Sequence, residues 1–420
     1  MLPSLSKIFE KIVNQRLVGF LHCQNVLYSG QYAFRESSDT VSATVDMISE
    51  IQMKIDENQI TGLLSLDLRK AFDTVHHGIM LRKMELLGVR GKSHDWFSNS
   101  LSNRTTFVSL GNTASTKEQV KYGVPQGSIL GPTLFLIYIN SISNLKLNGK
   151  IKLYADDTTI VYYGKSTDEL KRKITQDLNI ISKWLQMHKL TLNIQKSSYM
   201  FISKTRVGGG TPLTLNNEDL KYSCVTKYLG LFIDETLSWE HHLSNLRKKI
   251  AAPAGVLRRI SHCLPKYLVR GIYYSLIHSH LQYLTIIWYP ACATFIRPIQ
   301  ILQNKAIKNI YGLPTRYSTV DLYKNYNIMN LQSLYKYQIS CYIHQVLSHS
   351  RLTDISLTLR SEIHNYSTRH CNDVEIERVL SNHGKRSIFH GGVQIYNSIP
   401  INIRKYTYKQ FKRKIKIVFG

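Results

Sequence analysis

The sequence predicts an α+β protein: helices and short strands alternate up to about residue 235, and helices alone follow. Two observations carry this prediction. Short β-prone runs separate segments with apolar residues at helical spacing in the first half, and from about residue 237 only helical spacing continues. This order is typical of an α+β body followed by a helical module.

The N-terminal part predicts two helices and one strand. Ile8, Ile12 and Leu17 stand at near-helical spacing, and residues 41–55 (VSATVDMISEIQMKI) roughly keep the same period. The run GLLSLDL at residues 62–68 is apolar on both sides of one acid, which indicates a short buried strand.

The middle of the chain predicts a buried helix and then a hairpin. Residues 124–142 (VPQGSILGPTLFLIYINSI) begin with turn residues and become strongly apolar, which favours a buried helix. In KIKLYADDTTIVYYG, residues 150–164, two β-prone halves flank Asp156 and Asp157, as expected for a hairpin.

The clearest helix of the sequence follows this hairpin. Ser166 and Glu169 have the spacing of a capping box, and one face is then apolar: Leu170, Ile174, Leu178, Ile181 and Leu185. Short strands are predicted at residues 190–194, 198–203 and 227–234. A further helix is expected from residue 239, with Pro253 ending or bending it.

The composition points to a polyanionic partner. Lys and Arg number 54 against 28 acidic residues, a formal net charge of +26, which is too large for an ordinary metabolic enzyme. Nucleic acid is the simplest partner. An anionic membrane surface is the weaker alternative, because no long basic amphipathic helix stands out and the most apolar stretch, residues 276–295, is broken by polar residues and a proline.

The cysteines argue against a cysteine metal site. The six cysteines are scattered, and none forms a CxxC pair. A reduced, intracellular setting fits, in the nucleus or the cytoplasm, because the sequence shows no signal peptide.

The adjacent acids in KLYADDTTI need a physical reason. Neighbours on a straight strand point to opposite faces, but at a tight turn the carboxylates of Asp156 and Asp157 can approach one point. Oxygen-only ligands favour Mg²⁺ or Mn²⁺, and Asp67 in LLSLDL is a candidate third ligand. A strand acid and a turn pair in a basic chain suit two-ion phosphoryl transfer. A solvated Asp-Asp turn without metal is the plain alternative.

Six stretches in one order resemble the reverse transcriptases of non-LTR retrotransposons, of the jockey-like lineages. They are SLSKIFEKIVNQRL, QYAFRESSDT, SLDLRKAFDTVHH, YGVPQGSILGPTLFLIYIN, YADD and KYLGLFID. Two C-terminal stretches, at residues 288–314 and 394–416, also resemble that family's tail, so the matches together run nearly end to end. It implies a right-hand polymerase with RNA-directed DNA polymerase activity, an RNA template, a DNA primer or target DNA, and dNTPs as substrates.

The resemblance assigns a role to each matching residue of the metal site. It makes Asp67, Asp156 and Asp157 the catalytic metal ligands, with the main-chain carbonyl of Leu68 also facing a metal. Tyr154 would lie beneath the primer end.

It also assigns residues around the incoming nucleotide. Phe72 would pack under its sugar and exclude a 2′-hydroxyl. Gln126 and Gly127 would lie against the nucleotide and the template base. Arg35 would contact the triphosphate, and Lys196 would neutralise or protonate the leaving pyrophosphate.

The rest of the resemblance concerns the primer and the duplex. Tyr228, Leu229 and Gly230 match the primer grip, a hairpin that positions the 3′ end. A thumb would hold the template–primer duplex through phosphates, with Arg247, Lys248 and Lys249 as candidates. The implied regions are partial fingers (1–60), palm with remaining fingers elements and primer grip (61–236), a thumb-like helical module (237–320) and a basic C-terminal region (321–420).

Departures from the family keep two alternatives open. The family usually carries more chain before residue 4, including an endonuclease, which implies an N-terminally truncated copy. The family's second Arg in the QYAFR stretch is replaced by Ser38, and Asp39 adds a negative charge. One alternative is therefore an inactive remnant that only binds nucleic acid, and the other is a two-metal nuclease.

Overall fold

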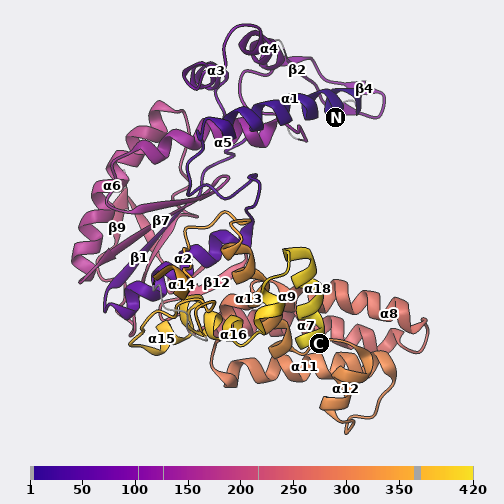
Figure 1. Cartoon of the computed structure of the whole chain (residues 1–420). Helices are drawn as coiled ribbons and strands as arrows, with labels where there is room; N and C mark the ends of the chain where they lie inside the picture. Colours follow the sequence, from indigo (N-terminus) through magenta and orange to yellow (C-terminus); the bar gives the residue numbers. More distant parts are fainter. Residues whose placement is uncertain (1–3, 103, 126, 216, 364–369, 420) are drawn as a thin grey trace. The chain divides into compact units, whose positions relative to one another are not determined.

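The computed structural model describes residues 4–102, 104–125, 127–215, 217–363 and 370–419 (Figure 1). The chain forms two compact units. The first contains residues 1–43, 61–201 and 208–223, and the second contains residues 44–60, 202–207 and 224–420.

A six-stranded sheet forms the centre of the first unit. Its strand order is β6-β7-β1-β8-β10-β9, with β6 antiparallel to β7, and β10 parallel to β8 and antiparallel to β9. The strands are β1 (Ile60–Leu66), β6 (Lys150–Tyr154), β7 (Asp157–Gly164), β8 (Ser198–Ile202), β9 (Leu213–Leu215) and β10 (Glu218–Tyr222). The predicted α+β class is confirmed.

Helices and two small ribbons complete this unit. The helices are α1 (Ser4–Cys23), α3 (His77–Leu86), α4 (Lys92–Leu101), α5 (Gly131–Asn140) and α6 (Thr167–Met187). The ribbons pair β2 (Thr105–Thr106) with β5 (Glu118–Gln119), and β3 (Ser109–Leu110) with β4 (Thr113–Ala114). As predicted, α5 is a buried helix, because Thr133 to Ile139 are all buried.

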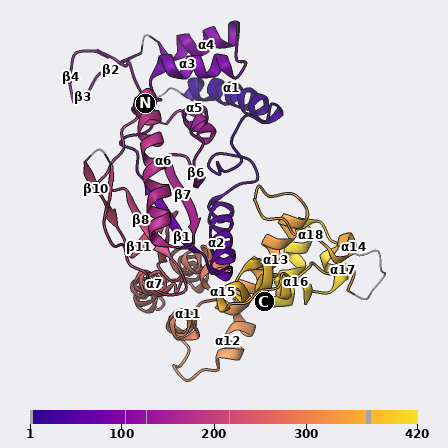
Figure 2. The same cartoon turned by 90° about the vertical axis from the view of Figure 1, so that its left-hand side faces the viewer.

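The predicted capped helix is α6, which lies along the sheet (Figure 2). The hydroxyl of Ser166 accepts the Glu169 N–H at 3.2 Å, and the Glu169 carboxylate accepts the Lys165 N–H at 2.9 Å. The predicted apolar face is buried, so local capping and periodicity together identified this helix correctly: Leu170, Ile174, Leu178, Ile181 and Leu185.

One strand prediction is wrong. Residues 190–194 form no ladder and pair only through an isolated bridge between Leu192 and Leu68. Their backbone groups bind the loop after β1 instead: the Arg69 N–H donates to the Thr191 carbonyl, and the Asn193 N–H to the Asp67 carbonyl, both at 2.8 Å. Residues 190–194 therefore make a short backbone contact with this loop and do not form a strand, although their apolar and polar residues alternate.

The second unit is mainly helical. It contains most of α2 (Thr40–Asp56), which was predicted, and a hairpin of β11 (Val225–Tyr228) and β12 (Leu231–Asp234). The family resemblance implies this hairpin, whereas the single strand predicted from the pattern at residues 227–234 is wrong, because a turn at Leu229 and Gly230 divides it. Its longer helices are α7 (Glu240–Ile260), α8 (Lys266–Tyr273), α11 (Ala293–Tyr311), α12 (Thr319–Tyr326), α13 (Leu331–Leu347) and α18 (Tyr408–Phe419). Shorter ones are α9 (Ser279–Gln282), α10 (Thr285–Trp288), α14 (Arg360–Ile363), α15 (Asn382–Lys385), α16 (Val393–Asn397) and α17 (Ile401–Arg404).

The helix α7 does not end at Pro253. It continues to Ile260. One buried face runs through both halves, from Leu243 to Leu257, and α7 packs against α11. Burial of this face outweighs the roughly 3 kcal/mol that an interior proline costs.

The apolar stretch at residues 276–295 does not form one helix. Leu284 has a φ of +53° between α9 and α10, which breaks the run. Among the described residues, none of the helices combines the length and the apolar character needed to span a bilayer.

Candidate active site

The predicted hairpin around the adjacent acids is present. β6 and β7 pair so that Tyr154 stands opposite Asp157, and Ala155 and Asp156 form a two-residue turn. Ala155 has a φ of +56°, a conformation in which glycine is the usual residue. Asp156 is half-buried and Asp157 is exposed, so both carboxylates are within reach of solvent.

A residue that the sequence analysis missed holds this turn. The Gln31 side chain is 2% exposed, and its Oε1 accepts the N–H of Ala155 at 3.2 Å and that of Ala33 at 3.0 Å. The backbone around Gln31 also pairs with Leu153 of β6. Gln31 lies in the QYAFR stretch, but nothing in that pattern indicates a partner more than 100 residues away.

Asp67 directly follows β1 and is fixed through its backbone. Its N–H donates to the Ser197 hydroxyl at 3.1 Å, and its carbonyl accepts from the N–H of Asn193 at 2.8 Å. The strand order puts β1 next to β7, which Asp157 begins.

The donor types of this region suit a hard cation. Three carboxylates and the carbonyl of the buried Leu68 are oxygen ligands of the kind that Mg²⁺ takes. Within the described ranges, however, no three His, Cys, Asp or Glu side chains are gathered closely enough to hold an ion.

The loops at residues 67–77 and 122–128 are tied together. The Val124 N–H donates to the Phe72 carbonyl at 2.9 Å, and the Gly123 N–H to the Val75 carbonyl at 2.8 Å. Gly123 has a φ of +86°, and a Cβ there would lie 2.9 Å from the Asp73 carbonyl oxygen, so only glycine fits.

The predicted nucleotide residues on these loops have distinct surroundings. Phe72 is half-buried and stacks on the buried Phe135, with ring centroids 4.4 Å apart. Gly127 is exposed with a φ of +79°. Gln126 lies outside the described residues.

The two predicted cations have different roles in the fold. Arg35 Nη1 donates to the carbonyls of Tyr28 at 2.7 Å and Gln31 at 3.3 Å, and burial lowers the pKa of its guanidinium. Lys196 is exposed on the turn between Asn193 and Ser197. Because both of these residues bind the backbone of Asp67, the turn that carries Lys196 is anchored to Asp67.

The predicted primer-grip residues belong to the second unit. Tyr228 is the last residue of β11, and Leu229 and Gly230 form a two-residue turn with φ values of +43° and +87°. Both central residues thus have the positive φ of a type I′ turn. The Leu229 carbonyl accepts a hydrogen bond from the Tyr283 hydroxyl.

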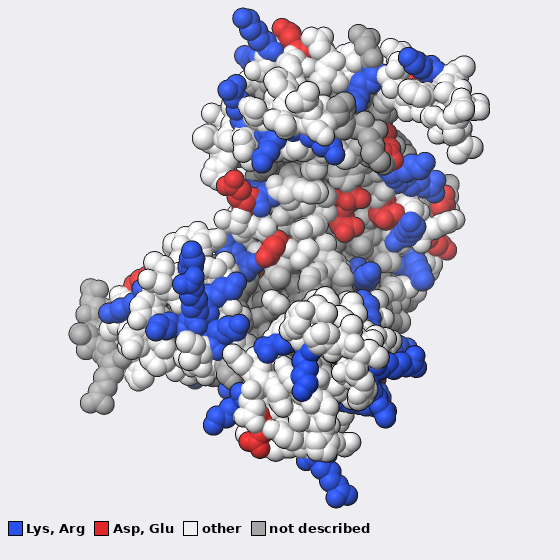
Figure 3. All heavy atoms as spheres, turned by 90° about the vertical axis from the view of Figure 1, so that its right-hand side faces the viewer, with Lys and Arg blue, Asp and Glu red and all other residues white. Residues whose placement is uncertain are grey.

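The predicted basic residues of α7, Arg247, Lys248 and Lys249, are all exposed, and so are Arg258 and Arg259 at its end. On the face that Figure 3 shows, Lys and Arg side chains are spread over many parts of the surface, with acidic side chains among them. This distribution agrees with a polyanionic partner.

Comparison with known proteins identifies the family. The family described as "Reverse transcriptase (RNA-dependent DNA polymerase)" matches residues 1–233. Among curated proteins, the probable RNA-directed DNA polymerase from transposon X-element of Drosophila melanogaster is 28% identical over 321 residues, covering 74% of this chain and 35% of its own length.

Two further relatives agree. The probable RNA-directed DNA polymerase from transposon BS of Drosophila melanogaster is 24% identical, covering 83% of this chain and 40% of its own length. The RNA-directed DNA polymerase from mobile element jockey of the same species is 25% identical, covering 79% and 37%. The chain thus spans 35 to 40% of the length of these relatives.

Among solved structures, apo telomerase from Candida tropicalis is 13% identical with a TM-score of 0.43, covering 82% of this chain and 56% of that one. This likeness is too weak to add to the assignment. The family match alone covers more than half of the chain, and the relatives are retrotransposon polymerases. The protein therefore belongs to the reverse transcriptase family, among the non-LTR retrotransposon enzymes that its motif order predicts.

Proposed function

We propose that this chain catalyses RNA-templated DNA synthesis, in which a primer 3′-hydroxyl attacks the α-phosphate of a dNTP and pyrophosphate leaves. One observation carries the proposal. In a member of the reverse transcriptase family, Asp67 directly follows β1, Asp156 lies in the turn before β7, and Asp157 is the first residue of β7, the strand beside β1.

Asp67, Asp156 and Asp157 would hold two Mg²⁺ or Mn²⁺ ions, with the Leu68 carbonyl as a further ligand. Bound ions would lower the pKa of the attacking hydroxyl and stabilise the leaving pyrophosphate. The chain contributes the positions of its acids: Gln31 fixes the turn of Asp156, and Ser197 fixes the backbone of Asp67.

The nucleotide would lie between the tied loops. Phe72, held by its stack on Phe135, would support the sugar, and Gln126 and Gly127 would face the base. Arg35 and Lys196 would meet the triphosphate. The Arg35 guanidinium carries five N–H donors, so its bonds to two carbonyls leave donors for a phosphate.

The primer would be positioned by Tyr154 and by the turn of Tyr228, Leu229 and Gly230. The exposed cations of α7 would contact the duplex backbone, as expected of a thumb at residues 237–320. Residues 1–60 would be fingers, 61–236 mainly palm, and 321–420 a basic C-terminal region. All six cysteines are free, which suits a reduced compartment, nucleus or cytoplasm.

Primer extension on poly(rA)/oligo(dT) with Mg²⁺ tests the proposal. The wild-type chain should extend the primer, and a D156A/D157A variant should lose extension while it still binds the duplex. If both proteins bind the duplex and neither extends the primer, the chain is an inactive remnant that only binds nucleic acid. Release of labelled nucleotides from the primer without dNTP would instead indicate a nuclease.

A further inference from the structure

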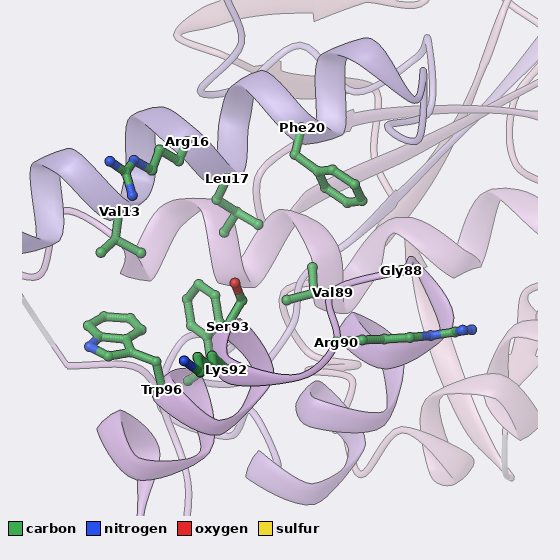
Figure 4. A pocket seen from close by; sticks show the side chains of 11 residues that line it. Val13, Arg16, Leu17, Phe20, Gly88, Val89, Arg90, Lys92, Ser93 and Trp96 are labelled. Atoms are coloured by element: carbon green, nitrogen blue, oxygen red, sulfur yellow. The ribbon is translucent and has the colours of Figure 1, made fainter.

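A pocket of about 410 Å³ lies within the first unit, between α1 and the start of α4. Figure 4 shows Val13, Arg16, Leu17 and Phe20 reaching it from α1. The opposite wall comes from the turn before α4 and from its first residues. This volume lies in the range of small-molecule sites.

The floor and one wall of the pocket are apolar and aromatic. Leu17, Val89 and Phe97 are buried beneath it. Trp96 is half-buried and packs edge-on against Phe97, with ring centroids 5.0 Å apart, and its ring also lies 5.7 Å from that of Phe9 at a tilt of 48°. Because Trp96 still lines the pocket, part of its indole ring is a surface on which a planar group could stack.

The rim of the pocket is cationic. Arg16, Arg90 and Lys92 line it and are exposed, and no acidic residue is among the residues that line it. Asp95, one turn into α4, is exposed but does not line the pocket. Three like charges around one hollow repel each other, so an anion at the rim relieves that repulsion.

A ligand that fits must join an anion to a planar, largely apolar body. An unpaired nucleotide has this chemistry, since its phosphate suits Arg and Lys and its base suits an aromatic ring. A base within a duplex presents no free face for stacking. A net charge of +26 favours a nucleic acid over a small free anion.

We propose that this pocket binds one unpaired nucleotide of a single-stranded nucleic acid. Its base stacks on Trp96, and its phosphates meet Arg16 and Lys92 at that end of the pocket and Arg90 at the other end. The inference rests on the proposed function only for the class of ligand, because the pocket contains none of the residues assigned to catalysis.

The tryptophan itself reports binding. The other three tryptophans, Trp184, Trp239 and Trp288, are 3%, 2% and 0% exposed, whereas Trp96 is half-buried. The full chain is titrated with rA₆ and dA₆ in EDTA, without dNTP, at several salt concentrations. The intrinsic fluorescence should decrease to saturation with both hexamers if the pocket does not distinguish ribose from deoxyribose. It should decrease with only one hexamer if the pocket discriminates by the 2′-hydroxyl.

Variants separate the ring from the charges. Trp96→Ala should weaken hexamer binding about tenfold, while Trp96→Phe should keep the affinity, measured by anisotropy, and lose the fluorescence response. R90A/K92A changes only exposed side chains. It should weaken binding and reduce the salt slope by about 0.7 for each phosphate that is no longer neutralised. Arg172→Ala, an exposed cation of α6, is the matched control and should bind as wild type.

Three results would overturn the proposal: hexamer affinity unchanged in both Trp96→Ala and R90A/K92A, an equal fluorescence change with a blunt duplex, or a response to anionic vesicles or an acidic peptide but not to the hexamers. The last result would assign the pocket to another class of partner. The D156A/D157A variant should give the wild-type hexamer response, so failure of the polymerase assay and failure of this inference are distinguishable.

Discussion

The buried Gln31 side chain is a positioning residue for the turn that carries Asp156. Its Oε1 accepts the N–H groups of Ala33 and Ala155, and its Nε2 has no hydrogen-bond partner among the described residues. Loss of the acceptor alone would leave two buried N–H groups unpaired, which costs about 1–3 kcal/mol each.

We predict that Gln31→Met, which keeps the length but removes the acceptor, lowers the melting temperature and raises the Mg²⁺ concentration needed for half-maximal primer extension. A merely structural role would lower stability without moving the metal dependence. An unchanged Mg²⁺ requirement, measured well below the melting temperature, would therefore remove Gln31 from this role.

We predict that the stability of the fold depends on pH because of the largely buried Lys83 side chain. Its Nζ donates to the Tyr138 carbonyl and to the Ser141 hydroxyl, and burial lowers its pKa to about 7. The unfolded lysine keeps its ordinary pKa near 10.5, so above pH 7 the unfolded state binds more protons than the folded one. Stability should therefore rise with pH above 7.

The measurement is urea unfolding between pH 7 and 8.5. In this window the opposing effect of the Cys341 thiol stays small, because burial raises its folded pKa to about 12 and the unfolded thiol ionises mainly near its ordinary pKa of 9.0. The expected gain is on the order of 1–2 kcal/mol across the window. Lys83→Met should be more stable at pH 7 and should lose this slope. The same slope in the variant would show that another group causes it.

At the scale of the element, the turn of the β11–β12 hairpin contains a residue whose backbone conformation lowers stability. Leu229 has a φ of +43° in a type I′ turn, where Asn is favoured and a branched apolar residue is strained by about 1–2 kcal/mol. Strained residues of this kind persist where function retains them.

We predict that Leu229→Asn raises the melting temperature but reduces primer extension. Gly230→Ala should lower stability, because its φ is +87° and the new Cβ would lie 3.2 Å from the Tyr283 ring. If Leu229→Asn stabilised the protein and left extension unchanged, the side chain of Leu229 would have no part in holding the primer.

The elements that the sequence predicts correctly are those with local signals. The cap and the apolar periodicity of helix α6 lie within one segment, and both strands and the turn of the β6–β7 hairpin are consecutive in the sequence. The contacts that position the candidate site are not local. Gln31 and Ala155 are 124 residues apart, and Asp67 and Ser197 are 130 apart. The strand expected at residues 190–194 failed for the same reason, because its partner is the loop after β1.

At the scale of the whole molecule, one helix links distant parts of the chain. Most of α2 belongs to the second unit together with residues 224–420. The Asp46 carboxylate accepts from the Asp354 N–H at 2.9 Å and from the Thr353 hydroxyl. The Asp56 carboxylate accepts from the N–H groups of Leu380 and Ser381. These pairs are 307 to 325 residues apart, so the C-terminal region supplies the hydrogen-bond donors for two carboxylates of α2.

This arrangement predicts coupled protection of α2 and the C-terminal region. Asp46 is 3% exposed and its carboxylate accepts two part-buried hydrogen bonds, so Asp46→Ala removes both bonds and should cost about 1–3 kcal/mol. Asp56→Ala, at a half-buried position, should cost less. In hydrogen exchange, both variants should lose protection in residues 44–56, 350–363 and 370–385 together, while the sheet of the first unit keeps its wild-type rates. Met53→Ala, at an exposed position of the same helix, is a control for the change to alanine. If α2 exchanged at its wild-type rate in Asp46→Ala while residues 350–363 and 370–385 lost protection, other neighbours would stabilise the helix, and the C-terminal region would not contribute to its stability.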